Sequence, residues 1–525
     1  MDINNAFKSA CKVILGEEIG ELSGYANWLY EKNGPRIVKK SYLSGSDVVF
    51  AAEEYQVVSQ AARLDEFDMS KQYAPISIND LKDIDSLISA ISQRAVFCGN
   101  IVLGNSSNVE QSTVITDSNH ILHSERAAFC KYVAYSTRGS YSENIYGCKG
   151  FGPAKYCIKA KGAWDVTRCF NSTKIDFSSD IYYSHGLTNC QDCFFCFNLK
   201  GKRNMIGNYQ LGKGKYLEIK SALLGQIRDE LEKNKRLPTL IDALRDVEAD
   251  YSLLKNTMKL YRNKMHSDEK KDKSKIESAF SLTSKLVLSK SLEPIDSYSN
   301  YLSKNSGMRI VRSKSCISDS PVLLPDFADF ADYPANRLLT QQEADFCGEH
   351  MALTEVESLS LGNFSSFISR IAFFSPYWNT GKVHNNIDSP LNIDSSDCYN
   401  GVLFMKSKLC SFCEMSRNCE NIFGCREARH AQFCMKSYFS TKITRCFEVD
   451  NCNSCSDCYF CHNIENCTEC MFCFNVKSMR YAIGNVEYPK EEYMQIKKKL
   501  LSGMVLELEK NKTLELGIFN IGCKK

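Results

Sequence analysis

Seven cysteines near the C-terminus have the spacing of metal ligands. They recur every three or six residues as overlapping C-x-x-C pairs: Cys452, Cys455, Cys458, Cys461, Cys467, Cys470 and Cys473. Such pairs hold structural zinc, because two thiolates at this spacing reach one tetrahedral ion. Disulfide bonds are the other chemistry open to them, and these are typical of secreted proteins. Which of these applies depends on how the surrounding chain positions the thiols.

The cysteines belong to a repeat of twelve residues. Between Ile393 and Val476, the third, sixth, ninth and twelfth residues of each row are small or apolar, and the residues between them are mostly polar, charged or aromatic. A fixed repeat whose same-phase residues stack is typical of a solenoid. Twelve residues are too few for a helical or leucine-rich repeat. The pattern therefore predicts a narrow β-solenoid, with a core one small side chain wide.

The same rows occur earlier in the chain, from about residue 104 to 199, with Ser, Ile or Val in columns that later hold Cys. Many segments also recur in the second half of the chain at a nearly constant offset; Thr167–Phe170, for example, matches Thr444–Phe447. The sequence therefore predicts an internal duplication. We expect a first copy at 1–275, with its solenoid at about 104–199, and a second copy at 276–525, with its solenoid at about 393–476.

Each predicted solenoid is flanked by helices, so the expected fold class is mainly β with flanking helices. Apolar residues at helical spacing and helix-start signals indicate these segments. The expected helices are 5–22, 80–93, 214–235 and 238–265 in the first copy, and 278–291, 356–370 and 489–511 in the second. Short strands are expected at 36–40 and 309–312, and the charged run 266–275 is the best candidate for a linker.

The repeat itself offers a third explanation of the cysteines. Every C-x-x-C pair joins successive inward positions, so the spacing arises without a metal. In the first copy, the equivalents of Cys452, Cys455, Cys458 and Cys461 are Ile175, Ser178, Ile181 and Ser184. A four-cysteine zinc site does not survive those replacements. We therefore interpret the cysteines as small apolar core residues, and zinc bound to the second copy alone remains the alternative.

Two resemblances follow from these motifs. The twelve-residue geometry resembles the β-solenoid of beetle antifreeze proteins, although the outward Thr-x-Thr columns of that fold are missing. The solenoid ends, CFFCFNLKGKRNMIGNYQLGKGKYLEIK at Cys193–Lys220 and CMFCFNVKSMRYAIGNVEYPKEEYMQIK at Cys470–Lys497, resemble an uncharacterised Cys-rich repeat family of tailed phages and small-genome bacteria. The second resemblance implies a viral or phage-associated origin. The antifreeze resemblance implies that third and ninth residues of a row face each other and can form disulfides, as in Cys190/Cys196, Cys419/Cys425, Cys455/Cys461 and Cys467/Cys473.

A few other residues are weaker site candidates. His430 and His462 lie between inward columns, so we expect both to face solvent. Aromatic pairs near the solenoid ends, Phe194–Phe195 and Tyr459–Phe460, are expected to pack under the helix that follows. Basic residues at the same ends are interpreted as solvated caps, with phosphate or an acidic partner as the alternative: Lys200, Lys202, Arg203, Lys477 and Arg480.

Composition and the remaining motifs bear on the class of function. The 525 residues are 43% hydrophobic and 24% charged, with a net charge of +3, which is ordinary for a globular chain. No apolar run is long enough to span a bilayer, and the N-terminus lacks a secretory signal, so we expect a cytoplasmic protein, in the host cytoplasm and virion if it is viral. There is no P-loop, Rossmann fingerprint or nucleophile–base motif.

We therefore predict a non-enzymatic structural or assembly protein. Its expected partners are protein subunits of a larger assembly, and neither nucleic acid, a membrane nor a small-molecule substrate is expected. No cofactor is expected either, apart from possible zinc. The alternative is a zinc-stabilised module that binds nucleic acid or another protein.

Overall fold

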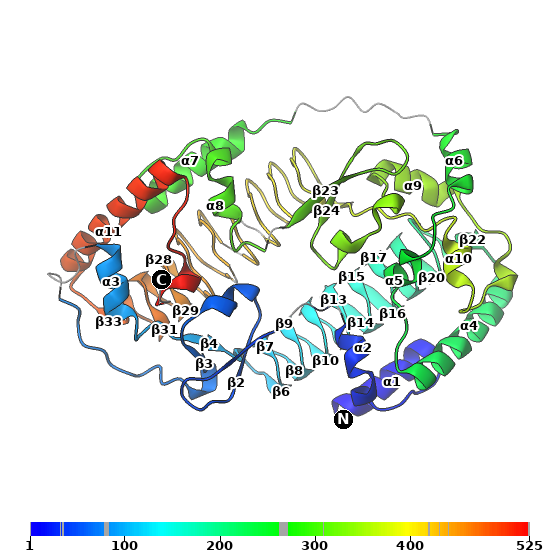
Figure 1. Cartoon of the computed structure of the whole chain (residues 1–525), viewed down its shortest axis with the longest axis horizontal. Coiled ribbons are helices and arrows are strands. Elements are labelled where there is room, and N and C mark those ends of the chain that lie inside the picture. The colour runs from blue at the N-terminus through cyan, green and yellow to red at the C-terminus, as the bar shows by residue number, and fades with distance from the viewer. Residues whose placement is uncertain are drawn as a thin grey trace. The chain divides into compact units, whose positions relative to one another are not determined.

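In the computed structural model, the chain forms long parallel β-sheets with helices beside them (Figure 1). The structure describes residues 2–31, 33, 36–77, 83–261, 271–307, 309–417, 421–429, 431–438 and 440–522. The chain divides into two compact units, and each is composed of three separate stretches. Unit 1 consists of Met1–Pro35, Ile101–Lys264 and Val311–Tyr377, and unit 2 consists of Arg36–Asn100, Met265–Ile310 and Trp378–Lys525.

Unit 1 is built on a ten-stranded and an eight-stranded sheet, which together are called the first stack. From β5 to β20, successive strands alternate between the two sheets, and β21 and β22 extend the larger one. Strand pairs within each sheet are parallel, except for the antiparallel pair β21–β22 at the end. The larger sheet contains β6 (Ser107–Glu110), β8 (Asn119–Leu122), β10 (Lys131–Ala134), β12 (Glu143–Tyr146), β14 (Ala154–Ile158), β16 (Val166–Phe170), β18 (Ser179–Tyr182), β20 (Gln191–Phe194), β21 (Arg203–Ile206) and β22 (Tyr209–Gln210). The smaller contains β5 (Val102–Leu103), β7 (Thr113–Thr116), β9 (Glu125–Ala128), β11 (Thr137–Ser140), β13 (Lys149–Phe151), β15 (Lys161–Trp164), β17 (Thr173–Asp176) and β19 (His185–Thr188).

The strands pair in a register of twelve residues. Val133 lies beside Ile145, and Ile145 beside Cys157, so residues at the same position of successive rows form a column. These three side chains are fully buried in one apolar cluster with the other inward residues of the stack. The predicted period and inward positions are therefore confirmed for these residues.

Inward serines also complete the backbone hydrogen bonding. The Ser184 hydroxyl donates to the carbonyl of Tyr182 (2.8 Å) and accepts the amide of Cys196 (2.9 Å), twelve residues on. Its own amide donates to the hydroxyl of Ser172 (3.0 Å). A buried amide without a partner destabilises a fold by about 1–3 kcal/mol. The serine columns are therefore hydrogen-bonding ladders as well as space-filling residues.

Most inward residues of the first stack follow a residue with a left-handed backbone. In one row these are Tyr132, Tyr135, Arg138 and Tyr141, with φ of 55°, 54°, 60° and 52°. This conformation costs most residues about 1–2 kcal/mol and is easiest for Gly, Asn and Asp. It turns the chain at four places in this row. Aromatic and basic residues at many of these places conceal the pattern in the sequence.

Helices cover the first stack. Helix α1 (Ile3–Leu15) packs across β10, β12, β14 and β16, burying Phe7 and Ile14 at helical spacing (Figure 1). Helix α4 (Lys213–Asn234) contacts β21 at the end of the stack, as expected. The helix expected at 238–265 is instead two short helices, and the one expected at 356–370 is limited to a short segment. The remaining helices of unit 1 are α2 (Ala26–Tyr30), α5 (Leu240–Arg245), α6 (Ser252–Met258), α9 (Gln341–His350) and α10 (Phe364–Ile368).

Unit 2 contains a second set of parallel strands, called the second stack. Its strands are β25 (Trp378–Thr380), β26 (Leu391–Ile393), β27 (Leu403–Met405), β28 (Ser456–Tyr459), β29 (His462–Glu465), β30 (Thr468–Met471), β31 (Phe474–Lys477) and β32 (Arg480–Ile483), followed by antiparallel β33 (Val486–Glu487). Between β27 and β28 the twelve-residue register continues as single bridges, such as Phe423 to Met435. Parallel pairing begins at Trp378, earlier than the expected residue 393. The pair β25–β26 is one residue out of the twelve-residue register, whereas the bridges from His384 to Ser396 and from Ile387 to Tyr399 keep it.

Unit 2 also contains helices and short strands outside the second stack. Helix α7 (Ser274–Leu288) and helix α11 (Lys490–Asn511) lie in positions along the chain that correspond to α1 and α4. The further elements of this unit are α3 (Ile84–Ile91), α8 (Ser299–Ser303), β1 (Ile37–Lys40), β2 (Asp47–Phe50), β3 (Ala61–Arg63) and β4 (Phe97–Gly99). A two-stranded sheet that belongs to unit 1, apart from Ile310, contains β23 (Ile310–Lys314) and β24 (Pro321–Pro325).

The compact units differ from the expected contiguous copies 1–275 and 276–525. Residues 36–100, from the first half of the chain, belong to unit 2, and residues 311–377, from the second half, belong to unit 1. Aromatic side chains of each stretch are buried against the stack of that unit, which gives the physical reason. Most of the proposed linker 266–275 lies outside the described residues.

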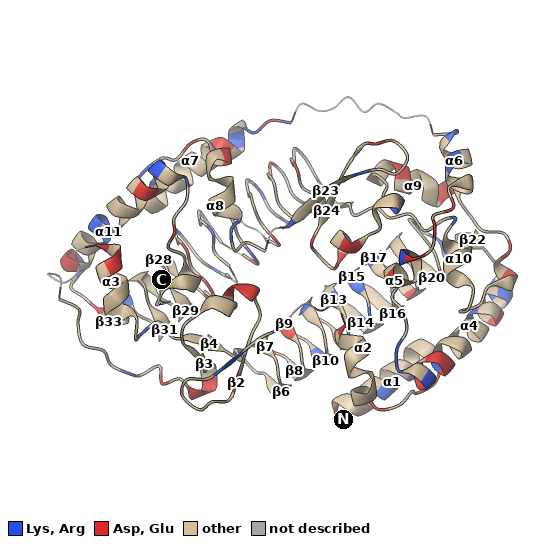
Figure 2. Cartoon of the chain, viewed as in Figure 1, with Lys and Arg blue, Asp and Glu red and all other residues tan. Residues whose placement is uncertain are grey.

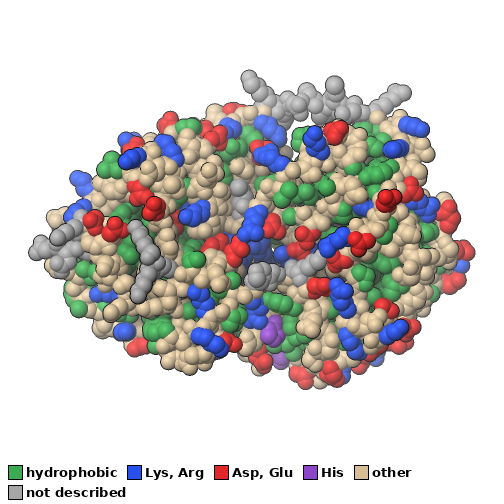
Figure 3. All heavy atoms as spheres, viewed as in Figure 1, with side chains coloured by type: hydrophobic (Ala, Val, Ile, Leu, Met, Phe, Trp, Pro, Cys, Tyr) green, Lys and Arg blue, Asp and Glu red, His purple; other side chains and the backbone are tan. Residues whose placement is uncertain are grey.

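Charged side chains of both signs are interspersed along the helices and over the surface (Figures 2 and 3). In the part of the chain that the structure describes, no helix has both the length and the apolar character needed to cross a membrane.

Candidate functional site

The seven candidate zinc ligands lie in successive rows of the second stack and are all buried. Cys455, Cys461 and Cys473 donate their S–H groups to the carbonyl two residues earlier, with S···O distances of 3.1, 3.3 and 3.4 Å. Inward serines of the first stack bond in the same way, for example Ser178 to Asp176 at 2.7 Å. A thiol in unit 2 thus occupies the place of a hydroxyl in unit 1.

Burial also keeps these thiols protonated. Loss of solvation raises the pKa of Cys452, Cys461 and Cys473 above the ordinary thiol value. Zinc binds the thiolate, so a raised pKa works against metal binding. Among the described residues, no group of three or more His, Cys, Asp and Glu side chains is arranged to hold a metal ion. The geometry favours core packing as the role of the cysteines.

Among the described residues, a disulfide in the second stack differs from the pairing that the antifreeze resemblance implies. It joins Cys413 to Cys425, the ninth residues of adjacent rows, whose Cα atoms are 4.6 Å apart. Of the expected partners across one row, Cys419 lies outside the described residues. The other expected partners are free thiols in this structure: Cys190, Cys196, Cys455, Cys461, Cys467 and Cys473.

His462 lies in a buried polar cluster, so the expectation that it faces solvent is wrong. Its Nδ1 atom is 2.5 Å from Asp450 Oδ2, and its Nε2 atom accepts the amide of Cys98 (2.9 Å). The Tyr55 hydroxyl donates to the same carboxylate at 2.8 Å. Residues 36–100 supply Tyr55 and Cys98 and cover the histidine, which sequence periodicity did not reveal. His430, the other histidine expected to face solvent, lies outside the described residues.

This cluster contains the imidazole and carboxylate of an acid–base centre, but a substrate has no access to them. Because Nε2 accepts an amide hydrogen, the proton of a neutral His462 lies on Nδ1 and points to Asp450. General-base catalysis needs a free imidazole nitrogen within reach of the substrate proton. Here both ring nitrogens are engaged, and both His462 and Asp450 are fully buried. The arrangement attaches a chain segment to the second stack.

A second buried cluster lies in unit 2. Glu448 and Lys436 form an ion pair of 2.5 Å, and both side chains are buried. The hydroxyls of Tyr301, on α8, and Tyr438 donate to the same carboxylate at 3.2 and 3.3 Å, and the amide of Ile518 donates at 3.3 Å. A buried charge requires several such partners. This cluster therefore ties α8 and the C-terminal segment to the second stack.

Unit 1 has a counterpart of the histidine cluster, built on His185. Its Nδ1 atom is 2.8 Å from Thr173 Oγ1 and 3.4 Å from the hydroxyl of Tyr333. Phe374 packs against the imidazole, with ring centroids 4.8 Å apart. Burial lowers the pKa of His185 well below its ordinary value, so the ring is neutral. At the position of the Asp450 carboxylate in unit 2, unit 1 has the hydroxyl of Thr173. This hydroxyl is a sufficient hydrogen-bond partner for a neutral histidine.

Two lysines of the first stack are also buried. Lys159 donates to the carbonyls of Trp28 (2.7 Å) and Glu31 (3.2 Å), and Lys174 donates to the carbonyl of Ser375 (3.1 Å). Burial lowers the pKa of each lysine to about 8. Both ammonium groups therefore bind backbone carbonyls of segments that cover the first stack. Neither lysine was singled out by sequence, because in the repeat it is an ordinary outward residue.

The other candidates are placed as follows. Phe194 and Phe195 are buried, and Phe195 stacks on Phe364 of α10. Tyr459 lies under Lys497 of α11, the helix that follows the second stack, as expected. The five basic residues at the ends of the stacks are exposed: Lys200, Lys202, Arg203, Lys477 and Arg480. Lys200 pairs with Asp345 (2.8 Å) and Lys477 with Glu465 (2.7 Å), as solvated caps do.

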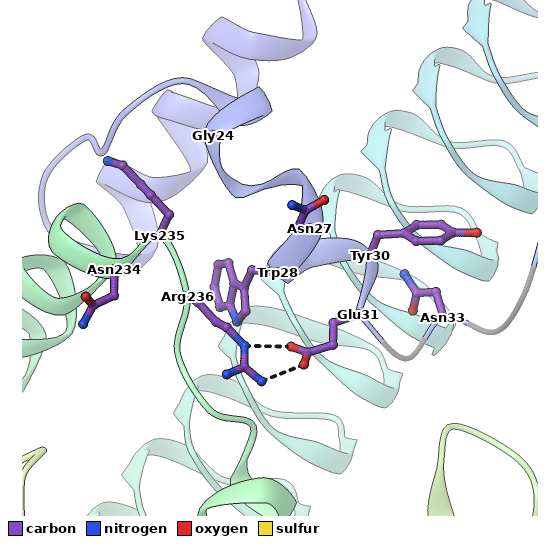
Figure 4. Close-up of a pocket in the computed structure, with 9 residues that line it drawn as sticks. All are labelled: Gly24, Asn27, Trp28, Tyr30, Glu31, Asn33, Asn234, Lys235 and Arg236. Carbon is purple, nitrogen blue, oxygen red and sulfur yellow. Dashed lines mark hydrogen bonds and ion pairs between the residues drawn. The ribbon is translucent and has the colours of Figure 1, made fainter.

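A surface pocket of about 660 Å³ lies in unit 1 between α2 and the end of α4 (Figure 4). Glu31 and Arg236 form an ion pair of 2.7 Å at this pocket, and the Trp28 indole donates to the carbonyl of Leu237 (2.9 Å). These polar groups are engaged with protein partners. The pocket is lined by Gly24, Asn27, Trp28, Tyr30, Glu31, Asn33, Asn234, Lys235 and Arg236. The described side chains that line it include no nucleophile–base pair.

No protein-family model matches the chain, and neither a curated protein nor a solved structure is significantly similar to it.

Proposed function

We propose that this chain is a non-enzymatic structural or assembly protein, made of two tandem β-solenoids that arose by internal duplication. The twelve-residue register and its inward columns support the solenoid interpretation in each unit. In this interpretation each row is one coil, and the left-handed residues, four of them in a row such as 130–141, turn the chain around the core.

Matching contacts in the two units support the duplication. Helices α4 and α11 are both 22 residues long, and they begin at the matching residues Lys213 and Lys490. Lys220 of α4 lies 4.9 Å from the ring centroid of Tyr182, and Lys497 of α11 lies 4.7 Å from that of Tyr459. The two lysines and the two tyrosines are separated by the same offset in the sequence. Preservation of such contacts is expected of two copies of one ancestral unit.

One observation carries the non-enzymatic proposal: the side chains with catalytic potential are committed to holding the fold. His462 uses both ring nitrogens within a buried cluster, and Lys159 and Lys174 donate to carbonyls of covering segments. The seven clustered thiols of the second stack are buried, and the pKa of each is raised above the ordinary thiol value. A reaction centre instead needs such groups at a surface that substrate reaches.

Outward aromatic residues provide a surface for protein partners. Phe129 and Tyr141, one row apart in the first stack, are 42% and 55% exposed and stack at 4.8 Å. Exposed aromatic rings are enriched at protein–protein interfaces, where they bury large area at low entropic cost. We propose that this surface binds neighbouring protein subunits and buries about 800 Å² or more per partner. The unit 2 residue matching Phe129 is Lys406, which makes the two units different in this respect.

Sedimentation equilibrium of the purified full-length chain tests the proposal. We expect concentration-dependent self-association, weakened at least tenfold in the double variant Phe129→Ser/Tyr141→Ser. The variant Lys406→Ser, at the matching place in unit 2, is the control and should associate like the wild type. Circular dichroism checks that all variants are folded. A chain that stays monomeric at every concentration contradicts the proposal.

The zinc-stabilised binding module is the second candidate, and the C-x-x-C cluster is the observation in its favour. In that case a chelator would melt unit 2 and leave unit 1 folded, and native mass spectrometry would detect stoichiometric zinc. Binding to nucleic acid would weaken steeply with salt. We expect none of these results. A monomer that holds stoichiometric zinc would reverse the order of the two proposals.

The motif at the end of each stack suggests a biological setting. Its resemblance to Cys-rich repeat proteins of tailed phages supports the proposal of a virion or phage-associated component, acting in the host cytoplasm. A chain with two similar halves suits the bridging of adjacent subunits.

A further inference from the structure

Two stretches of the chain are docked on the stack of the opposite half. Residues 36–100 pack in unit 2 with the second stack, and residues 311–377 pack in unit 1 with the first stack. In the sequence these stretches precede the first and second stacks, respectively, and they match each other at the offset that relates the two copies. They are therefore equivalent segments found in exchanged places.

The aromatic contacts of the two segments are equivalent. Phe97 lies 4.9 Å from the His462 ring and 5.4 Å from the Phe474 ring. Its counterpart Phe374 lies 4.8 Å from the His185 ring and 5.9 Å from that of Phe197. The two phenylalanines, the two histidines and the two stack phenylalanines are all related by one sequence offset, but Phe97 and Phe374 each contact the stack of the other half.

Backbone recognition is equivalent too. The Asn198 side chain donates to the carbonyl of Phe373 at 2.9 Å, and the Asn475 side chain donates to the carbonyl of Val96 at 2.8 Å. Both asparagines are buried. A buried amide aimed at a backbone carbonyl fixes the position of a segment along the stack, whatever side chains the segment carries.

An ion pair at a matching row position completes each docking site. Arg426 of the second stack pairs with Glu54 at 2.9 Å, and Lys149 of the first stack pairs with Asp329 at 2.6 Å. Arg426 and Lys149 are again related by the offset between the copies. Lys161 adds a second cation to Asp329. Aromatic, polar and charged contacts thus recur in the same arrangement.

We propose that the two halves of the chain are interlocked by reciprocal exchange of these equivalent segments. Each stack carries a docking site whose ligand is the segment preceding the other stack, so neither half contains a complete unit. The inference rests on the duplication in the proposed function, and it is independent of whether the chain assembles with partners.

The matched variants Phe97→Ala and Phe374→Ala of the full-length chain test the exchange by hydrogen exchange and mass spectrometry. Loss of the Phe97 ring should accelerate amide exchange about tenfold or more in residues 462–477, and leave residues 185–200 unchanged. Phe374→Ala should accelerate exchange in residues 185–200 alone. Each substitution thus acts on the stack of the opposite half and serves as the control for the other.

Faster exchange in the stack of the same half, or no change in either stack, would overturn the inference. If an alanine variant does not fold, Phe97→Leu and Phe374→Leu should produce the same pattern with a smaller acceleration. Sedimentation behaviour tests assembly, whereas the location of the exchange effect tests the interlock. Failure of one proposal is therefore distinguishable from failure of the other.

Discussion

Removal of the Asp450 carboxylate should destabilise unit 2 more than the matching change destabilises unit 1. In Asp450→Ala, both the Tyr55 hydroxyl and His462 Nδ1 lose their acceptor in a fully buried place. An unpaired buried donor costs about 1–3 kcal/mol, so we expect a loss of about 2–6 kcal/mol. In Thr173→Ala, His185 loses one partner and keeps the hydroxyl of Tyr333 at 3.4 Å. That loss should be about half as large.

The assay is native-state hydrogen exchange of the full-length variants, because a chain of two units does not have a single unfolding free energy. Protection of residues 456–477 gives the local stability of unit 2, and residues 173–194 serve the same purpose in unit 1. A third variant, Asp450→Thr, installs the unit 1 residue in unit 2 and should recover part of the loss. Equal losses in Asp450→Ala and Thr173→Ala, or a loss below about 1 kcal/mol in the former, would refute the reasoning.

Two further predictions concern the stack interiors and pH. Ile181→Asp should lower the stability by several kcal/mol, because it places a carboxylate in a column without water. Cys434→Ser should lower it far less, because serine already occupies inward columns. Equal melting temperatures of the two variants would show that the register is wrong. Burial lowers the folded-state pKa of Lys159 to about 8 from 10.5. The unfolded chain therefore binds more protons between these values, and unit 1 should gain up to about 3 kcal/mol as pH rises from about 8 to 10.5. Lys159→Met should lack this gain in stability. If the difference in stability between wild type and variant does not change with pH, the prediction is contradicted.

The repeat could be predicted from the sequence because burial acts on every third residue. Val133, Ile145 and Cys157 form one column in the structure, as the twelve-residue period indicates. The left-handed residues were hidden, because Tyr132 and Arg138 occupy places where Gly or Asn would have revealed the backbone. Their strain is tolerated because each row is hydrogen-bonded on both sides.

The docking clusters were missed for a different reason. Periodicity correctly indicates that His462 points away from the core of its stack, but it gives no information on what covers that face. The sequence offset between the two halves relates Phe97 to Phe374 and His185 to His462. A match between the two halves of the sequence identifies equivalent residues. It does not show whether a segment packs on the stack of its own half or of the other half, because tertiary packing decides this.

The placement of residues 36–100 has a consequence for synthesis of the chain. Domains commonly fold from the N-terminus onward while they leave the ribosome. Here the first stack ends at Gln210, but the segment that covers it ends at Tyr377. Tyr55 and Phe97 contact their partners only after His462 and Phe474 have been translated. We therefore expect the aromatic side chains of Tyr55 and Phe97 to lack their native partners until most of the chain has been translated.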